Sequence, residues 1–303
     1  MNRVLVTGAT GFIGRHALAP LVARGFEVHA VSRRRLPDAD GVTWRQADLL
    51  DGASPARVVA AVRPSHMLHL AWTTERNTYW RSPANLDWLA ASLTLLRAFA
   101  AAGGKRVVAA GTCAEYDWRR LGQAPCRERE TACTPHTLYG QAKHALHRVL
   151  AAFAGEEGLS HAWGRVFFAY GPDEPPERVV AAVIRALLAG EPARCTHGRQ
   201  VRDFMDARDA GAAFAALLDC DVEGPVNVAS GVAVTVAEVA ELLGDIVGRA
   251  ELVRLGALEA RAGDPPRLVA DTTRLNTEVG FRPRYDLRAG LADAVTWWRQ
   301  RLG

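Results

Sequence analysis

The chain has 303 residues, of which 49% are hydrophobic and 23% are charged, and its formal net charge is +4. That length suffices for one large α/β unit or two smaller domains, and the composition is that of a folded globular protein. The positive charge is spread without a polybasic block, and no apolar run approaches the ~18 residues that span a bilayer, so we expect no nucleic-acid partner and no membrane segment.

Short β-branched runs alternate with longer Ala- and Leu-rich segments over the first 170 residues. Such alternation predicts right-handed βαβ units and an α/β fold, in which helices cover both faces of a Rossmann-type, doubly wound parallel sheet. In chain order, the pattern predicts strands at 3–8, 26–32, 42–48, 66–71, 105–112 and 161–170, and helices at 12–25, 55–62, 84–102 and 138–156.

The rhythm becomes less regular after residue 170, where Pro172, Pro175 and Pro176 follow closely. We predict a dinucleotide-binding domain over 1–170 and a smaller α/β domain, mainly for substrate, over 171–303. A stretch at about 204–229 is expected to return to the first domain.

Three glycines, Gly8, Gly11 and Gly14, lie between the first predicted strand and the first predicted helix. Glycine permits a tight turn and close backbone approach to a pyrophosphate, while the free N–H groups of the helix N-terminus favour an anion. The position after a strand and before a helix predicts a dinucleotide-binding loop, with Thr10, Phe12 and Ile13 as its other contacts.

The second predicted strand ends in Ser32, Arg33 and Arg34, with no carboxylate to hold the ribose 2′-hydroxyl of NAD. A hydroxyl and guanidinium groups suit a 2′-phosphate, which favours NADPH/NADP⁺; a solvated basic turn is the alternative. Asp48 closes the third strand next to Leu49, and its carboxylate is placed to accept from an adenine amino group.

Tyr139 and Lys143 are four residues apart on a predicted helix and therefore share one face. An ammonium near a phenol stabilises the tyrosinate and lowers its pKa, and lysine can also bind a ribose hydroxyl. Thr112 ends a predicted core strand at the carboxyl edge, where its hydroxyl can polarise a carbonyl. These three residues are the predicted catalytic set.

With these motifs, the chain resembles the extended short-chain dehydrogenases/reductases of the nucleotide-sugar epimerase/dehydratase/reductase superfamily, and in "AGTCAEYDW" it is similar to deoxysugar 4-ketoreductases. The resemblance spans nearly the whole chain and rests on "TGATGFIG", "HLAW", "GTCAEY", "YGQAK", "RVFFAYGP", "RDFMDARDAGAAF" and the later segments. It implies a nucleotide-diphosphate keto-sugar as substrate, a homodimer formed through 84–102 and 138–156, and these site roles: Leu70, Ala71 and Trp72 against the nicotinamide, Arg202 on the diphosphate, and Cys113, Phe168 and Arg178 at the sugar.

Some residues of this chain differ from the family pattern, and these differences limit the reactions that we expect. Family dehydratases carry Asp-Glu after the catalytic Thr, whereas this chain has Cys113 and Ala114, so loss of water is not expected. Glu115 comes one place later, and we expect it to point elsewhere. Segment 73–83 is rich in Tyr, Trp and Arg; it is equally compatible with a sugar-pocket wall and with a packed surface loop. An ion pair with Asp203 or Asp206 is the alternative role for Arg202.

The five cysteines form neither a CxxC pair nor a zinc-like spacing with histidine, so we expect no metal and a reducing compartment. An N-terminal segment without the secretory pattern then predicts a cytoplasmic protein.

Three functions remain open. The first is NADPH-dependent reduction of a nucleotide-linked 4-keto-6-deoxyhexose to the 4-hydroxy sugar; the second is a nucleotide-sugar 4-epimerase with retained NAD. The third, a non-catalytic NADP(H)-sensing protein, is disfavoured because Tyr139 and Lys143 are present.

Overall fold

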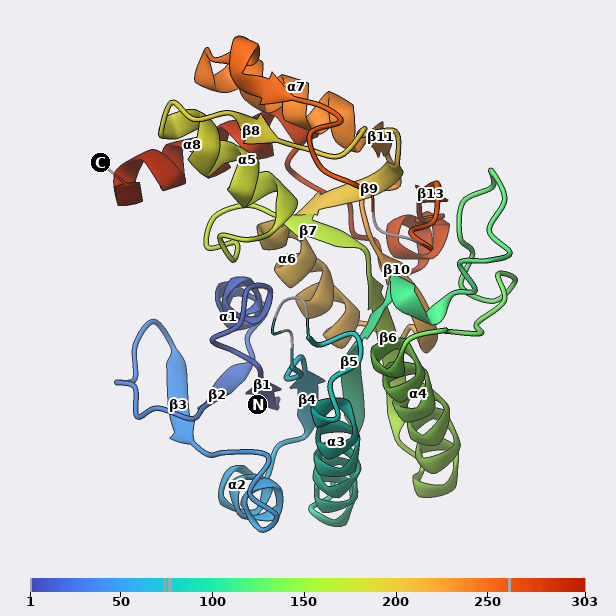
Figure 1. Cartoon of the computed structure of the whole chain (residues 1–303). Coiled ribbons are helices and arrows are strands. Elements are labelled where there is room, and N and C mark those ends of the chain that lie inside the picture. Colours follow the sequence, from blue (N-terminus) through green and yellow to red (C-terminus); the bar gives the residue numbers. More distant parts are fainter. Residues whose placement is uncertain (1, 74, 76–77, 261–262, 303) are drawn as a thin grey trace.

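The computed structural model describes residues 2–73, 75, 78–260 and 263–302. Its centre is a parallel sheet of seven strands in the order β10-β6-β5-β4-β1-β2-β3 (Figure 1). The strands are β1 (Arg3–Thr7), β2 (Glu27–Ser32), β3 (Val42–Gln46), β4 (His66–His69), β5 (Arg106–Thr112), β6 (Ser160–Val166) and β10 (Gly224–Val228). The order reverses at β1, which pairs with both β2 and β4, and this reversal is where such sheets bind ligands. The predicted Rossmann-type fold is confirmed.

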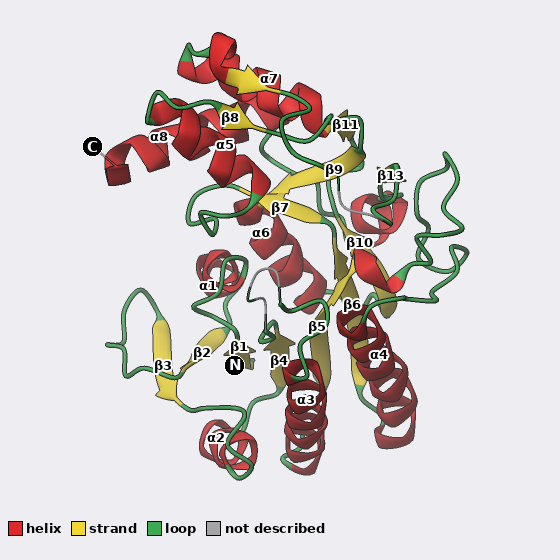
Figure 2. Cartoon of the chain, in the orientation of Figure 1, coloured by secondary structure: helices red, strands yellow, loops and turns green. Residues whose placement is uncertain are grey.

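Helices cover both faces of this sheet (Figure 2). Side chains alternate along β1, so that Val4 and Val6 pack toward one helical layer and Leu5 packs toward the other. The first layer is α1 (Gly14–Ala23) with α6 (Ala207–Leu218), and the second is α2 (Ser54–Val62), α3 (Ala84–Ala101) and α4 (Leu138–Glu157). Burial on both faces explains why the strands read as continuous apolar runs.

The single strand predicted at 161–170 is two strands. After β6 the backbone N–H of Phe167 bonds the Val228 carbonyl, and β7 (Phe168–Tyr170) then joins a second sheet by pairing with β9 (Val201–Asp206). β9 also pairs with β11 (Ala233–Thr235) and β13 (Arg267–Leu268). An unbroken apolar pattern predicts extended backbone, but it carries no signal that the neighbouring strands change.

A separate apolar core lies above the sheet in Figure 1. It is built by α5 (Val179–Leu188), α7 (Val236–Val247) and α8 (Leu287–Leu302). A short pair, β8 (Ala193–Arg194) with β12 (Val253–Arg254), flanks them. The chain returns to the first sheet through α6 and β10, while the domain division at residue 171 stays a prediction.

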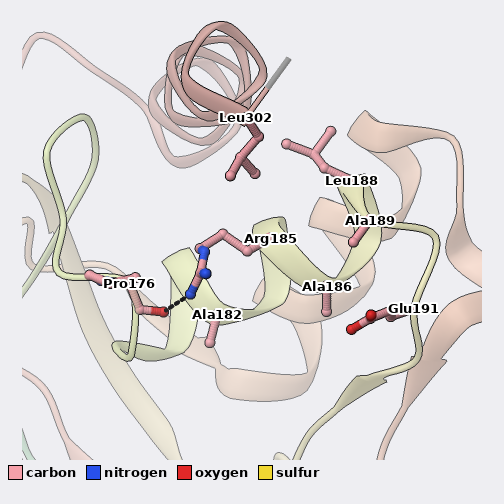
Figure 3. Close-up of a pocket in the computed structure, with 8 residues that line it drawn as sticks. All are labelled: Pro176, Ala182, Arg185, Ala186, Leu188, Ala189, Glu191 and Leu302. Atoms are coloured by element: carbon pink, nitrogen blue, oxygen red, sulfur yellow. Dashed lines mark hydrogen bonds between the residues drawn. The ribbon is translucent and has the colours of Figure 1, made fainter.

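In the part of the chain that the structure describes, no helix has both the length and the hydrophobicity that crossing a bilayer requires. A surface hollow of about 560 Å³ lies between α5 and the end of α8 (Figure 3). Arg185 reaches across it to the Pro176 carbonyl, and alanine and leucine side chains form the rest of the wall together with Glu191. None of the predicted site residues lines this hollow, so the predicted site lies elsewhere in the molecule.

Candidate active site

The glycine loop is held by contacts that exclude larger residues. A Cβ on Gly14 would lie 2.1 Å from the Gly8 carbonyl oxygen, and one on Gly8, where φ is +69°, would lie 2.6 Å from the Ala71 nitrogen. The Gly11 N–H donates to the Gly8 carbonyl at 2.9 Å. The turn delivers the N-terminus of α1 to the carboxyl edge of the sheet, where its N–H groups can receive a pyrophosphate. The residues present therefore fit a dinucleotide.

Phe12 of the glycine loop and Arg15 of α1 contact the segment that follows β7. The Arg178 guanidinium lies 5.4 Å from the centre of the Phe12 ring and 3.6 Å from Glu174, and Arg15 pairs with Asp173 at 2.5 Å. Arg178, predicted at the sugar, is thus placed beside the glycine loop.

The end of β2 presents exposed guanidinium groups. Ser32 is buried, and its hydroxyl accepts the Arg34 N–H at 3.1 Å, which shapes the turn; Arg33 and Arg34 extend into solvent. Asp48 is also exposed at the end of the third strand, whereas Leu49 is buried. The hydroxyl of Ser32 accepts one backbone N–H and keeps its own proton to donate, so Ser32 and the two arginines could together hold a phosphate at this place.

The loop after β4 is held by hydrogen bonds to β1 on one side and to α3 on the other. The Thr7 hydroxyl hydrogen-bonds the His69 ring at 2.7 Å and accepts the Ala71 N–H at 3.3 Å. The Trp72 indole N–H donates to Asn85 of α3 at 2.9 Å, and the centre of its ring lies 4.1 Å from Nζ of Lys143 on α4. Burial lowers the pKa of His69 to about 3, and this imidazole is therefore neutral. Leu70 and Ala71 lie on the same loop, directly against Gly8.

Two of the three predicted catalytic side chains meet directly. Thr137 caps α4 by accepting the Gly140 N–H at 3.1 Å, and a Cβ on Gly140 would lie 2.6 Å from the Ala114 carbonyl. The absent side chain thus lets α4 approach the end of β5. As a result the Thr112 side chain lies close enough to the Tyr139 phenol to lower its pKa.

Lys143 lies one helical turn after Tyr139 and is almost fully buried, with 3% exposure. Its Nζ donates to the Ala110 carbonyl at 2.8 Å and lies 4.1 Å from the centre of the Trp72 ring. Burial lowers the pKa of Lys143 to about 7, and the charge of Glu115 opposes this shift.

The pKa of Tyr139 departs from expectation. Burial raises it, the neighbouring Tyr79 adds to the rise, and the hydrogen bond from Thr112 only partly offsets it. The prediction that Lys143 lowers this pKa is not met here, because desolvation outweighs it and the lysine is turned to Ala110 and Trp72. At neutral pH the phenol carries its proton and is a donor.

Aromatic side chains surround Tyr139. Ring centres lie 5.0 Å away for Tyr79 and 5.6 Å away for Trp80, whose carbonyl accepts the Tyr139 N–H at 3.2 Å, and Trp118 packs on Trp80 at 5.8 Å. Residues 74, 76 and 77 of segment 73–83 lie outside the described residues. The described end of this segment, at Tyr79 and Trp80, contacts the candidate catalytic residue.

Three other predicted substrate residues, Arg202, Phe168 and Cys113, are related to one another by contacts and charge. Arg202 is buried, pairs with Asp264 at 2.7 Å rather than with Asp203 or Asp206, and lies 5.4 Å from the centre of the Phe168 ring. Its charge acts on the buried Cys113, whose pKa is raised by burial. Arg202, Phe168 and Cys113 thus form one wall.

Sequence reasoning missed the centre of this region, Glu115. It points away from the sugar side as expected, but into a buried network: its carboxylate accepts from the Thr112 N–H and the Trp163 indole at 2.8 Å and from Arg165 at 3.2 Å. His144 and His147 lie on its other side. The spacing of His144 and His147 on one helix face, and of Trp163 and Arg165 on one strand face, was the available signal.

Comparison with known proteins places the chain among nucleotide-sugar enzymes. Residues 4–229 match the NAD dependent epimerase/dehydratase family. UDP-glucose 4-epimerase of Rhizobium meliloti (strain 1021) is 27% identical, with 99% of this chain and 98% of that protein aligned. The dTDP-4-dehydro-6-deoxy-D-allose reductase of Streptomyces bikiniensis is 28% identical, with 98% and 96% aligned.

Among solved structures, MoeE5 in complex with UDP-glucuronic acid and NAD is 32% identical and superposes with a TM-score of 0.85, over 99% of this chain and 100% of that one. The predicted resemblance is confirmed. Because the match covers well over half of the sequence, the chain belongs to the NAD dependent epimerase/dehydratase family, a family of nucleotide-sugar-modifying short-chain dehydrogenases/reductases.

Proposed function

We propose that this enzyme is an NADPH-dependent reductase of a nucleotide-linked 4-keto-6-deoxyhexose. The observation that carries the proposal is the contact between the protonated Tyr139 phenol and Thr112 at the carboxyl end of β5. Reduction of a ketone needs a proton donor beside the carbonyl oxygen, and a tyrosine whose pKa is raised by burial is such a donor at neutral pH.

Each residue of the proposed catalytic set has a separate role in this reaction. When bound, the dinucleotide supplies hydride to C4 of the sugar. Tyr139 would give its proton to the C4 oxygen, Thr112 would donate a hydrogen bond to the same oxygen, and Lys143 would hold the ribose. The rings of Tyr79 and Trp80 pack against Tyr139 and shield it in part from water, which strengthens hydrogen bonds at the reacting oxygen.

NADP is the proposed cofactor because Arg33 and Arg34 are exposed at the end of β2 and no acidic residue stands there. A carboxylate would repel a 2′-phosphate, whereas guanidinium groups bind it through paired N–H donors. MoeE5 was solved in complex with NAD, so the proposed preference for NADP is a difference between this chain and that relative.

Dehydration is disfavoured by the residues after Thr112. Cys113 is buried with a raised pKa and Ala114 has no ionisable group, so neither can take the parts of a carboxylic acid and carboxylate. Glu115 is engaged in its own network behind Thr112.

A 4-epimerase with retained NAD is the second candidate, and the relatives favour it, since several of them are UDP-glucose 4-epimerases. The same Thr112, Tyr139 and Lys143 would serve both directions of hydride transfer. What supports reduction over epimerisation is the basic end of β2 together with the reductase among the relatives.

One experiment separates the two. The purified protein is assayed for bound dinucleotide and then incubated with NADPH and freshly made nucleotide 4-keto-6-deoxyhexoses, while absorbance of the reduced nicotinamide is followed. Reduction predicts little retained cofactor and consumption of NADPH with at least one sugar. Tightly held NAD, with interconversion of hexose epimers and no added cofactor, would instead support epimerisation.

We also propose a homodimer that forms through α3 and α4, and a cytoplasmic location. The two helices lie side by side on one face of the sheet (Figure 1), and Leu86 and Val149 on them are exposed. Sedimentation velocity on the wild type and on Val149→Glu tests the dimer, since a charge on this face should shift the protein to monomer.

A further inference from the structure

Glu115 is a carboxylate with no exposed surface, which is costly unless every oxygen is well paired. Oε1 accepts from the Thr112 N–H and from the Trp163 indole N–H, both at 2.8 Å, and Oε2 accepts from Arg165 Nε at 3.2 Å. Burial alone would raise its pKa, but His144, Arg165 and Trp163 lower it to about 2, so the group is an anion. No step of the proposed mechanism uses it.

Toward β5, Glu115 sets the orientation of Thr112. Residues Cys113–Glu115 form a single 3₁₀ turn in which Glu115 accepts the Thr112 N–H and the Thr112 hydroxyl accepts the Ala114 N–H at 3.2 Å. Because that hydroxyl accepts from Ala114, its own proton remains available to donate on the side where Tyr139 lies. Loss of the carboxylate would release this turn at both ends.

Toward α4, Glu115 contacts the helix that carries Tyr139 and Lys143. The Nδ1 atoms of His144 and His147 lie 3.7 Å and 3.8 Å from Oε2, and both are buried without a hydrogen-bond partner among the described residues. His147 also stacks on Trp163, with ring centres 5.0 Å apart. The carboxylate thus lies at the junction of β5, β6 and α4.

Among the described titratable groups around this junction, Glu115 is the anion that acts on Lys143. Arg165 of β6 is a cation that shares the carboxylate. His147, with a pKa of about 4, and His69 of β4, with a pKa of about 3, are neutral. His144 of α4 also faces the carboxylate. Cys113 is a buried thiol and Cys133 a partly buried one, both with a pKa raised by desolvation, and Tyr139 is a protonated phenol. Among described residues acting on Lys143, Glu115 is the one that favours its charged form.

We propose that Glu115 is a positioning residue: its carboxylate fixes the turn that places the Thr112 hydroxyl beside Tyr139, and its negative charge, 3.7 Å from His144 on the same turn of α4, favours the charged form of Lys143. The inference rests on the proposed roles of Thr112, Tyr139 and Lys143. A divalent cation held by Glu115, His144 and His147, whose ligand atoms lie within 4.8 Å of one another, is disfavoured because the Arg165 cation already occupies Oε2.

The chain offers a direct test, because it has two lysines, Lys105 and Lys143. Protein labelled with ¹³Cε,¹⁵Nζ-lysine gives two side-chain signals, and Lys105→Arg assigns them. The Lys143 signal is titrated in the wild type, in Glu115→Gln, and in Glu128→Gln as control. Glu128 is also buried, and its carboxylate accepts the Asn227 N–H at 2.8 Å, away from Thr112.

In the wild type the midpoint should lie near pH 7. Glu115→Gln should move it lower by about one pH unit, and Glu128→Gln should leave it in place. An unchanged midpoint in folded Glu115→Gln would overturn the proposal, as would uptake of one Zn²⁺ per chain that depends on Glu115. The readout requires no substrate, so it stands even if no sugar in the panel is reduced.

If Glu115→Gln does not fold, Glu115→Asp tests the positioning role instead. It keeps the charge but shortens the reach to the Thr112 N–H. The Lys143 midpoint should then match the wild type, while kcat falls about 10- to 100-fold, as for loss of an oriented hydrogen-bond donor, and KM for the dinucleotide stays unchanged. Wild-type kcat in this variant would contradict the positioning role.

Discussion

The ammonium of Lys143 is bonded to the Ala110 carbonyl at 2.8 Å, so the lysine of the predicted YxxxK pair is anchored to the end of β5 rather than to Tyr139. The Trp72 ring closes the other side of this ammonium at 4.1 Å. A compact charge on a flexible stem can occupy this narrow place and also rotate toward a ribose hydroxyl. A planar guanidinium is larger and directs its donors differently.

Replacing Lys143 by Arg should therefore lower kcat/KM for the proposed reduction by about 100-fold or more, although the positive charge is kept. The chain's other lysine provides the control: Lys105 is exposed, and Lys105→Arg should stay within about twofold of the wild type. Steady-state kinetics of NADPH oxidation measure both. Near-normal turnover in Lys143→Arg would mean that any cation suffices at this place.

The burial of Lys143 also predicts how stability depends on pH. Its pKa is about 7 in the folded chain and near 10.5 when unfolded. Below pH 7 both states hold the proton and the folded state bears the full cost of the buried charge; above it the folded state releases the proton, so this cost fades as the pH rises toward 10.5. Lys143→Met should thus stabilise the protein by a few kcal/mol near pH 6, and this gain should shrink with rising pH.

Urea unfolding at a series of pH values from about 6 to about 9.5 tests this dependence. Lys105→Met, at an exposed position, should show no comparable gain. A gain from Lys143→Met that is the same at every pH would indicate a packing effect rather than the removal of a buried charge.

The exposed arginines at the end of β2 predict the cofactor preference. Arg33→Ala combined with Arg34→Ala should raise KM for NADPH by about 10- to 100-fold, because charge-assisted bonds to the 2′-phosphate are lost. KM for NADH serves as the internal control and should change little, since NADH lacks that phosphate. Equal effects on both cofactors would show that these arginines do not select between them.

The glycine loop gives a steric prediction. A methyl group on Gly14 would collide with the Gly8 carbonyl at 2.1 Å, so Gly14→Ala should lower the free energy of unfolding by about 2 kcal/mol or more and abolish dinucleotide binding. Gly52 faces open space, and Gly52→Ala should change stability by less than about 0.5 kcal/mol. Thermal unfolding with and without NADPH measures both, and a cofactor-stabilised Gly14→Ala would refute the tight-turn account.

The first sheet was predictable because its signals are local. Each β-branched run and each amphipathic helix is encoded within about twenty residues, and Gly8, Gly11 and Gly14 lie together in sequence. Thr112, Tyr139 and Lys143 could be predicted for a similar reason: strand ends of a parallel sheet converge at one edge, and a spacing of four aligns side chains on a helix.

The network behind Thr112 was not predictable in the same way. Glu115 meets Trp163 and Arg165 at sequence separations of 48 and 50, and these contacts depend on the pairing of β5 with β6. The pairing of Arg202 with Asp264 and the change of sheet at Phe167 likewise depend on tertiary neighbours. Burial raises the pKa of Tyr139, and the neighbouring Tyr79 adds to the rise. The spacing of residues in the sequence does not reveal that these two rings pack together.

The central claim is that Tyr139 protonates a sugar oxygen while hydride reaches the adjacent carbon. The most direct measurement follows deuterium from [4-²H]NADPH into the product by NMR, using a nucleotide 4-keto-6-deoxyhexose that the wild type accepts and Tyr139→Phe as the matched variant. The account predicts deuterium at C4 of the sugar with the wild type and a loss of about 100-fold or more in its rate with Tyr139→Phe. Product that carries no deuterium at C4, or equal rates in the two proteins, would contradict it.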